Sequence, residues 1–200
     1  MEQFTPTTSR RTVLRTLTAA PLVANTGQPW DEALAALHKH YDDDPVRLIR
    51  TKPGRELSKE RYFRAEGFFP VFEGHAISDR DHFLYFAGIT AQLALSSHLV
   101  DVGFPDRWCA RYIGLRVAKS LAYANATGFD HDCQGMKRLA AVLTPYCKWN
   151  TPRLFGEPEP DDGGFDLAEV QSLLRALLDH VRDVTGHSRP GTRRSTAQRF

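Results

Sequence analysis

The stretch DHFLYFAGITAQLALSSHLV, from Asp81 to Val100, decides the fold of this chain. Its apolar side chains recur at spacings of three and four residues, which is the repeat of an α-helix. They occupy two neighbouring stripes of that helix, so little of its surface is polar. The stripes consist of Leu84, Gly88, Ala91, Leu95 and His98, and of Phe83, Ala87, Thr90, Ala94 and Ser97. A helix that is apolar nearly all round lies either in the middle of a bundle or in lipid.

The second half of this helix favours a position in a bundle over one in lipid. The apolar run is close to a bilayer span in length. It is nevertheless interrupted by the polar side chains of Gln92, Ser96, Ser97 and His98. We therefore predict a buried central helix over about residues 79–100, and we expect no transmembrane span.

The rest of the chain also shows helical patterns. Its apolar residues keep the helical repeat and seldom alternate at a period of two. Prolines near helix starts and glycines after helix ends mark the boundaries. The predicted helices cover residues 29–40, 56–66, 105–127, 131–144 and 166–185, and Pro53–Gly54 is expected to end a short segment before the second of them. The predicted fold is all-α, a single irregular or orthogonal bundle around the central helix.

Length and composition fit one globular domain between two terminal segments. A chain of 200 residues can bury a core without a disulfide or a metal ion. With 42% apolar and 25% charged residues, it is neither disordered throughout nor a collagen or coiled-coil rod. We expect the bundle over residues 26–186, a separate segment at 1–25, and a disordered basic tail at 187–200.

Three cysteines are present, and their pairing is left open by the sequence. An odd number leaves at least one thiol unpaired within the chain, and no Cys-x-x-Cys pair indicates a zinc or redox site. Cys133 lies on the apolar stripe of its predicted helix, which indicates a small buried side chain. In an exported protein, Cys109 could form a disulfide with Cys133 or with Cys147.

The N-terminal segment carries a targeting pattern. Residues 9–15 read Ser-Arg-Arg-Thr-Val-Leu-Arg, and an uncharged, weakly apolar run follows to Ala24. This pattern resembles a twin-arginine export signal, with Arg10 and Arg11 as the arginine pair. The resemblance implies a bacterial protein that folds in the cytoplasm, crosses the membrane through the twin-arginine machinery, and becomes periplasmic or secreted. The alternative is a basic N-terminal arm on a cytoplasmic protein.

Two groups of histidine and aspartate could carry chemistry. Imidazoles and carboxylates, the ligands of zinc or iron, crowd the start of the central helix at His75, Asp79, Asp81 and His82. The alternative is that the carboxylates simply stabilise the positive end of the helix.

The second group consists of His98 and Asp101, one helical turn apart. A carboxylate there could fix the tautomer of a buried imidazole and raise its basicity for general-base catalysis. The alternative is a core histidine whose ring nitrogens are satisfied by hydrogen bonds.

The overall charge gives no general reason to expect a nucleic-acid partner. Lys and Arg total 26 against 24 Asp and Glu, for a net charge of +2. Cations nevertheless outnumber acids between Arg47 and Arg64, where Tyr62 and Phe63 could stack on bases. These cations include Arg47, Arg50, Lys52, Arg55, Arg61 and Arg64. They could bind a polyanion or form an ordinary solvated face.

No complete catalytic motif is present. The sequence contains no nucleophile-elbow, Walker or dinucleotide-binding glycine pattern, and it indicates no particular cofactor. The leading hypothesis is therefore a non-enzymatic, exported, all-helical bacterial domain that binds a protein partner or a small ligand. The alternatives are a metal-dependent or acid–base enzyme that uses the histidine and aspartate groups, and a cytoplasmic polyanion binder that uses the Arg47–Arg64 stretch.

Overall fold

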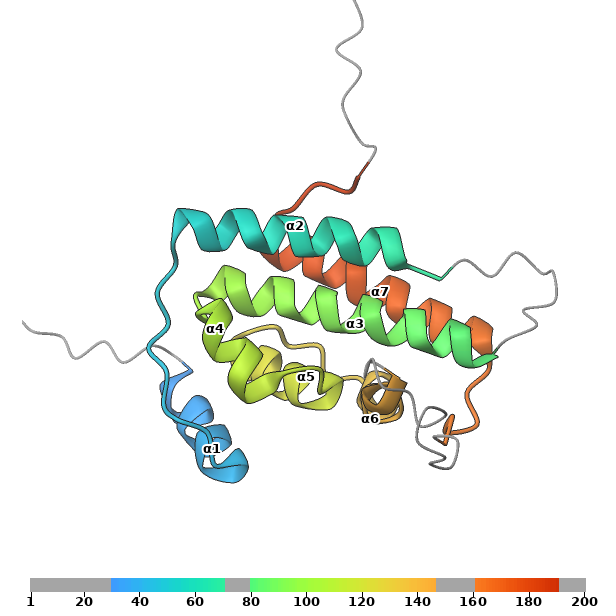
Figure 1. Ribbon diagram of the computed structural model, residues 1–200, viewed down its shortest axis with the longest axis horizontal. Helices are drawn as coiled ribbons and strands as arrows, with labels where there is room; N and C mark the ends of the chain where they lie inside the picture. Colours follow the sequence, from blue (N-terminus) through green and yellow to red (C-terminus); the bar gives the residue numbers. More distant parts are fainter. Residues whose placement is uncertain (1–29, 71–79, 147–160, 191–200) are drawn as a thin grey trace, which may run out of the picture.

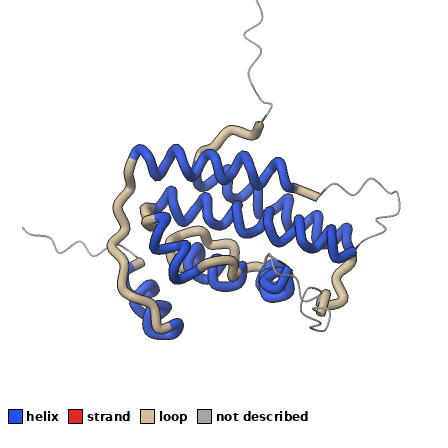
Figure 2. Tube along the Cα trace, viewed as in Figure 1, coloured by secondary structure: helices blue, strands red, loops and turns tan. Residues whose placement is uncertain are grey.

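The computed structural model describes residues 30–70, 80–146 and 161–190, and within these ranges the regular secondary structure is helical, with no strand. The helices are α1 (Asp31–Tyr41), α2 (Lys52–Phe68), α3 (Arg80–Val102), α4 (Asp106–Trp108), the π-helical turn η2 (Cys109–Ile113), α5 (Val117–Asn125), α6 (Gln134–Tyr146) and α7 (Leu167–Thr185). Figure 2 shows how loops connect these helices into one bundle. The prediction of an all-α fold is confirmed.

Helix α3 is the centre of the bundle. It contacts α2, α5, α6 and α7. In Figure 1, α2 runs alongside α3, α7 packs behind this pair, and α5 and α6 cover the lower side of α3. By length and composition α3 could cross a membrane, but 67% of its most apolar window is buried inside the protein. The predicted central helix is therefore confirmed, and other helices of the same chain enclose it.

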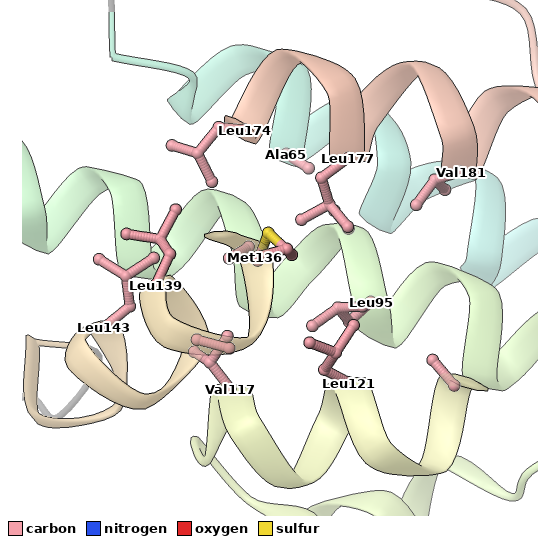
Figure 3. Packing of buried hydrophobic residues seen from close by; sticks show 14 of the residues in the cluster. Ala65, Leu95, Val117, Leu121, Met136, Leu139, Leu143, Leu174, Leu177 and Val181 are labelled. Atoms are coloured by element: carbon pink, nitrogen blue, oxygen red, sulfur yellow. The ribbon is translucent and has the colours of Figure 1, made fainter. Parts of the chain in front are cut away.

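The core forms where α3, α5, α6 and α7 converge. Figure 3 shows apolar side chains from these helices pointing toward one another. They include Leu95, Leu121, Met136, Leu139, Leu174 and Leu177, each at most 3% exposed. Because a fully buried side chain of this size contributes roughly 1.5–3 kcal/mol, this cluster is the main stabilising element of the fold.

The predicted helix 105–127 is wrong in its continuity, because the chain breaks it into α4, η2 and α5. The break is at Gly114, whose backbone angles are φ 59° and ψ −133°. A residue with a side chain pays a steric penalty in this conformation, whereas glycine does not. The amide of Gly114 donates to the carbonyl of Cys109, which closes the wide π-helical turn.

The start of α2 also differs from the prediction. Pro53 and Gly54 lie in its first turn instead of ending the preceding segment, and the Thr51 hydroxyl caps the helix by accepting from the Gly54 amide at 3.1 Å. Proline is well suited to this first turn because its missing N–H has no helical partner there. Residues 42–50 are not helical and cross the end of α3, where Gly103 leaves room for the backbone of Ile49.

Two further expectations are wrong. Cys133 is exposed rather than buried, and its sulfur accepts from the Met136 amide at the start of α6. The predicted disordered tail from residue 187 is wrong for residues 187–190, because the His187 side chain is only 5% exposed. Cys109 is a buried free thiol and Cys133 is also unpaired, so they do not bridge each other. Cys147 and residues 191–200 lie outside the described residues.

Candidate functional site

An apolar groove lies between α2, α3 and the turn that follows η2. It consists of two adjoining cavities that share Gln92, Leu93 and Leu115. The larger cavity has a volume of about 410 Å³ and is lined by Arg64, Phe68, Tyr85, Phe86, Ile89, Gln92, Leu93 and Leu115. The smaller has a volume of about 340 Å³ and reaches Arg61, Ser96, Asp106 and Cys109. Cavities of these sizes fall in the range of small-molecule sites.

Helix α3 supplies the floor of the groove from a third face. Two neighbouring faces carry the stripes that pack into the core, whereas Tyr85, Phe86, Ile89 and Leu93 lie on the opposite side of the helix and are only partly buried. Phe68 at the end of α2 stacks on Phe86 with ring centroids 6.0 Å apart. The groove therefore has a continuous apolar floor.

Large apolar side chains at the rim of the groove are open to water. Phe68 is 39% exposed and Leu115, just beyond Gly114, is 40% exposed. Because burying such side chains is favourable, their exposure beside a cavity is typical of a surface that receives an apolar ligand. The break at Gly114, which sequence analysis missed, is what brings Leu115 to this rim.

The polar groups of the groove bond mainly to one another. The Arg61 guanidinium donates to the Ser96 hydroxyl and to the Asp106 carboxylate. The Gln92 amide nitrogen donates to the carbonyl of Gly114 at 2.9 Å, and its oxygen accepts from Ser120. Since these hydrogen bonds are already made, the groove resembles a binding surface more than a reactive centre.

Cys109 does not supply a nucleophile to the groove. Burial raises the pKa of its thiol to about 12, because an apolar environment disfavours the thiolate. The thiolate is the reactive form of cysteine, so at neutral pH this side chain is an unreactive thiol. Its contribution to the groove is to fill space behind the π-helical turn.

Arg64 is the one charged residue among the described side chains that line the larger cavity. It pairs with Glu60 on the same helix at 2.9 Å, but these side chains are 65% and 56% exposed. An ion pair so open to solvent contributes about 1 kcal/mol at most. The Arg64 guanidinium can therefore turn to an acidic ligand at little cost.

The predicted metal cluster is only partly described. His75 and Asp79 lie outside the described residues, and His82 is exposed and packs edge-on against Phe86. Among the residues that the structure describes, Asp81 included, no group of three His, Cys, Asp or Glu side chains is placed to hold a metal ion.

The structure does not bring His98 and Asp101 together. His98 is 3% exposed, and its Nε2 lies 3.3 Å from the Thr127 hydroxyl, which donates its own proton to backbone carbonyls. Asp101 instead accepts from Arg55 on α2 at 3.1 Å. Burial, and then the nearby His180, lower the pKa of His98 to about 4. His98 is thus a core residue and a poor general base at neutral pH.

The basic stretch does not form one continuous face. Each residue of a helix turns the direction of its side chain by about 100°, so Lys52 and Arg61, nine residues apart, point to opposite sides of α2. Arg61 and Arg64 line the groove, whereas Lys52 and Arg55 line a separate pocket. Arg47 and Arg50 are exposed in the segment before α2.

A buried ion pair attaches the segment that follows α1 to α5, and sequence analysis did not single it out. The Lys119 ammonium lies 2.7 Å from the Asp43 carboxylate, and the two side chains are only 3% and 4% exposed. Tyr123 donates to the same carboxylate at 2.6 Å, and the Tyr41 ring lies 4.5 Å from the ammonium. Burial and the nearby Asp43 raise the pKa of Tyr123. This closed cluster is structural, and the run of three aspartates at 42–44 was its only sequence signal.

The geometry of the groove is what marks it as the candidate site, and no similar protein adds to it. In comparisons with known proteins, the chain matches no family model, no curated protein and no solved structure.

Proposed function

We propose that the protein is a non-enzymatic binding domain whose groove receives an elongated apolar molecule with one acidic group, such as a long-chain carboxylate. One observation carries this proposal: the larger cavity of a water-exposed apolar groove, floored by a face of α3 that the core does not use, has Arg64 as the single cation among its described lining residues. The remaining polar groups of the groove are bonded to one another, which favours binding over catalysis.

The apolar floor sets the length of the ligand. Each buried methylene contributes about 0.8 kcal/mol, so about ten methylenes give roughly 8 kcal/mol. Association itself costs roughly 4 kcal/mol or more in lost translation and rotation. A chain of about four methylenes, worth roughly 3 kcal/mol, does not overcome this cost. We therefore expect dodecanoate to bind and hexanoate to show no measurable binding.

The acidic group is inferred from charge. A guanidinium can donate two parallel hydrogen bonds to a carboxylate, and no acidic residue lines the larger cavity among the described side chains. Arg64 therefore orients the ligand so that its carboxylate lies at the rim and its hydrocarbon chain extends over Ile89 and Leu93. Because the rim is wet, Arg64 contributes orientation more than affinity.

The second part of the proposal is that the protein is exported. The twin-arginine pattern at Arg10 and Arg11 supports a domain that folds in the cytoplasm and acts outside it. The mass of the mature protein from its native host tests this part. Export predicts loss of about 24 N-terminal residues, and a full-length mature chain would contradict it.

Calorimetric titration tests the groove. Dodecanoate, below its micelle concentration, should bind the full chain with one-to-one stoichiometry and a negative heat-capacity change. Ile89→Glu places a charge in the floor and should abolish this binding. The matched control is Val184→Glu, which places the same charge on an exposed apolar position of α7 and should leave binding unchanged. Equal binding by both variants, or no saturable binding by the unmodified chain, would overturn the proposal.

A further inference from the structure

A second pocket lies on the other side of α2. It has a volume of about 360 Å³ and is lined by Lys52, Arg55, Glu56, Lys59, Gly186, His187 and Ser188. One wall is the first two turns of α2, and the other is the segment that follows α7. In Figure 1 this segment leaves the end of α7 close to α2. We call this the basic pocket.

The cations of the basic pocket share one face of α2. Lys52, Arg55 and Lys59 are spaced by three and four residues, so their side chains project in similar directions. Arg55 is engaged by Asp101 and by the carbonyl of Thr185. Among the described residues, no carboxylate forms an ion pair with Lys52 or Lys59, and Glu56 is the single acid in the lining. The pocket therefore has uncompensated positive charge, which the N-terminus of α2 increases.

His187 is a buried imidazole that also lines this pocket. Its Nε2 lies 2.7 Å from the Ser58 hydroxyl, which is also 2.8 Å from the carbonyl of Ser97. The Ser58 hydroxyl can therefore accept a hydrogen bond from Nε2–H while it donates its own hydrogen bond to that carbonyl. No described residue forms a hydrogen bond with the other ring nitrogen, Nδ1. When His187 is protonated, Ser58 thus accepts from Nε2–H, and Nδ1–H is left to donate to a ligand.

Ser58 and His187 do not form a nucleophile–base pair. The Ser58 side chain is fully buried in the contact between α2 and α3, where no substrate reaches it. Ser97 closes the contact by donating to the carbonyl of Ser58 at 2.8 Å. The role of Ser58 is to hold the His187 ring in place.

We infer that the basic pocket binds a tetrahedral oxyanion, supplied either free, as inorganic phosphate, or by a small phosphorylated molecule. Lys52 and Lys59 provide the uncompensated charge, and His187 donates from Nδ1. This site is separate from the groove, and its test is independent of the proposed function.

The inferred site predicts tighter binding in mild acid. In the free protein, burial lowers the pKa of His187, with Arg55 and Lys59 acting in the same direction and Asp101 opposing them. A bound dianion would offset the two cations and favour the imidazolium. Since the complex then holds one more proton than the free protein, affinity for the anion should rise as the pH falls.

Sulfate is the probe, because its own charge does not change near neutral pH. At constant ionic strength, titration should show saturable binding that tightens at least about threefold between about pH 7.5 and about pH 6. The double variant Lys52→Gln/Lys59→Gln should weaken binding at least about fivefold. Lys39→Gln, an exposed lysine of α1, is the matched control and should have no effect.

The variant His187→Gln tests the imidazole, because a glutamine amide can still donate to Ser58. It should keep the fold, measured by its melting temperature, and lose the pH dependence of sulfate binding. A pH dependence that persists in this variant, or equal affinities for the double variant and the Lys39 control, would overturn the inference.

Comparing inorganic phosphate with glycerol phosphate at one pH separates the two sources of the anion. Tighter binding of glycerol phosphate supports a phosphorylated ligand, and tighter or equal binding of inorganic phosphate supports the free anion. Absence of saturable binding by either would contradict the site.

Discussion

The two sides of α2 differ in what their polar groups do. On the groove side, Arg61 is bonded to Ser96 and Asp106, so its charge is compensated and the cavity is apolar. On the other side, Lys52 and Lys59 have no acidic partner among the described residues, so the basic pocket keeps its positive charge. One helix can present both chemistries because its residues turn by about 100° each. What each side of α2 can bind therefore depends on whether its cations are paired with acidic residues, more than on how many cations it carries.

Both sides depend on the contact between α2 and α3, which buried serines fix. The Ser58 hydroxyl donates to the carbonyl of Ser97, the Ser97 hydroxyl donates to the carbonyl of Ser58, and the two hydroxyls lie 3.1 Å apart. At the far end of α2, Glu66 accepts from Arg175 and Arg189 of the α7 region. The predictions that follow separate this shared framework from the two sides it supports, from the largest expected effect to the smallest.

Asp43→Ala should damage stability without affecting either side of α2. It leaves the buried Lys119 ammonium without its partner, which costs about 3–5 kcal/mol. Denaturant unfolding should show this loss, while dodecanoate and sulfate affinities remain unchanged below the melting temperature. The double variant Asp43→Leu/Lys119→Leu should lose less stability than Asp43→Ala, because no unpaired charge stays buried. A double variant that is as unstable as the single one would contradict this account of the ion pair.

Acid should destabilise the framework through His98, which lies on the far side of α3 from the groove. Its pKa is about 4 in the folded protein, against an ordinary value of 6.5. Between these values the unfolded chain binds the proton and the folded chain does not. The free energy of unfolding should therefore fall by on the order of 3 kcal/mol as the pH drops from about 6.5 to about 4.

His98→Gln should remove most of this acid sensitivity, because its amide can still donate to Thr127 but does not titrate. Denaturant unfolding at several pH values measures the effect. An unchanged pH slope in this variant would show that another group is responsible. Above about pH 6, little of the effect is present, so the sulfate titrations report on a folded protein.

Ser58→Ala should affect the basic side directly and spare the groove side, because Ser97 still donates to the backbone carbonyl at position 58 and keeps α2 on α3. It leaves the Nε2 of His187 and the carbonyl of Ser97 without their hydroxyl partner, at a cost of about 1–3 kcal/mol. Sulfate affinity should fall because His187 is no longer held, whereas dodecanoate affinity should persist. Titration of both ligands against this variant measures the difference. Parallel losses of both affinities would mean that the two sides are not independent.

Arg64→Gln should produce the smallest effect and only on the groove side. Because Arg64 acts at a wet rim, dodecanoate affinity should fall about threefold, and dodecanol, which lacks the acid, should bind both forms equally. Sulfate binding should not change. A loss of dodecanol binding in this variant would assign Arg64 a packing role instead of a charge role.

Much of the framework could be predicted from the sequence, because core packing follows hydrophobic spacing. The two stripes of the central helix gave its burial correctly, and the repeat of Val170, Leu174 and Leu177 gave α7. The break at Gly114 was missed because glycine is tolerated inside many helices. The sequence does not show that the backbone of Gly114 adopts a positive φ here.

The two sides of α2 were not predictable in the same way. The floor of the groove consists of Tyr85, Phe86 and Ile89, which fall on neither core stripe. The sequence feature that could have predicted the groove was this third apolar face of the central helix. The basic pocket needs His187, which lies far from α2 in the sequence and was assigned to a disordered tail. Which cations are compensated depends on contacts such as Arg61 with Asp106, and spacing along the chain does not record them.

Mapping both ligands on one spectrum tests the central claim most directly. In amide NMR titrations of the full chain, dodecanoate should shift resonances around Ile89, Leu93 and Leu115, and sulfate should shift those around Lys52, Lys59 and His187. The account predicts two separate sets that respond additively when both ligands are present. A single set that responds to both ligands, or no saturable shift at the groove, would contradict it.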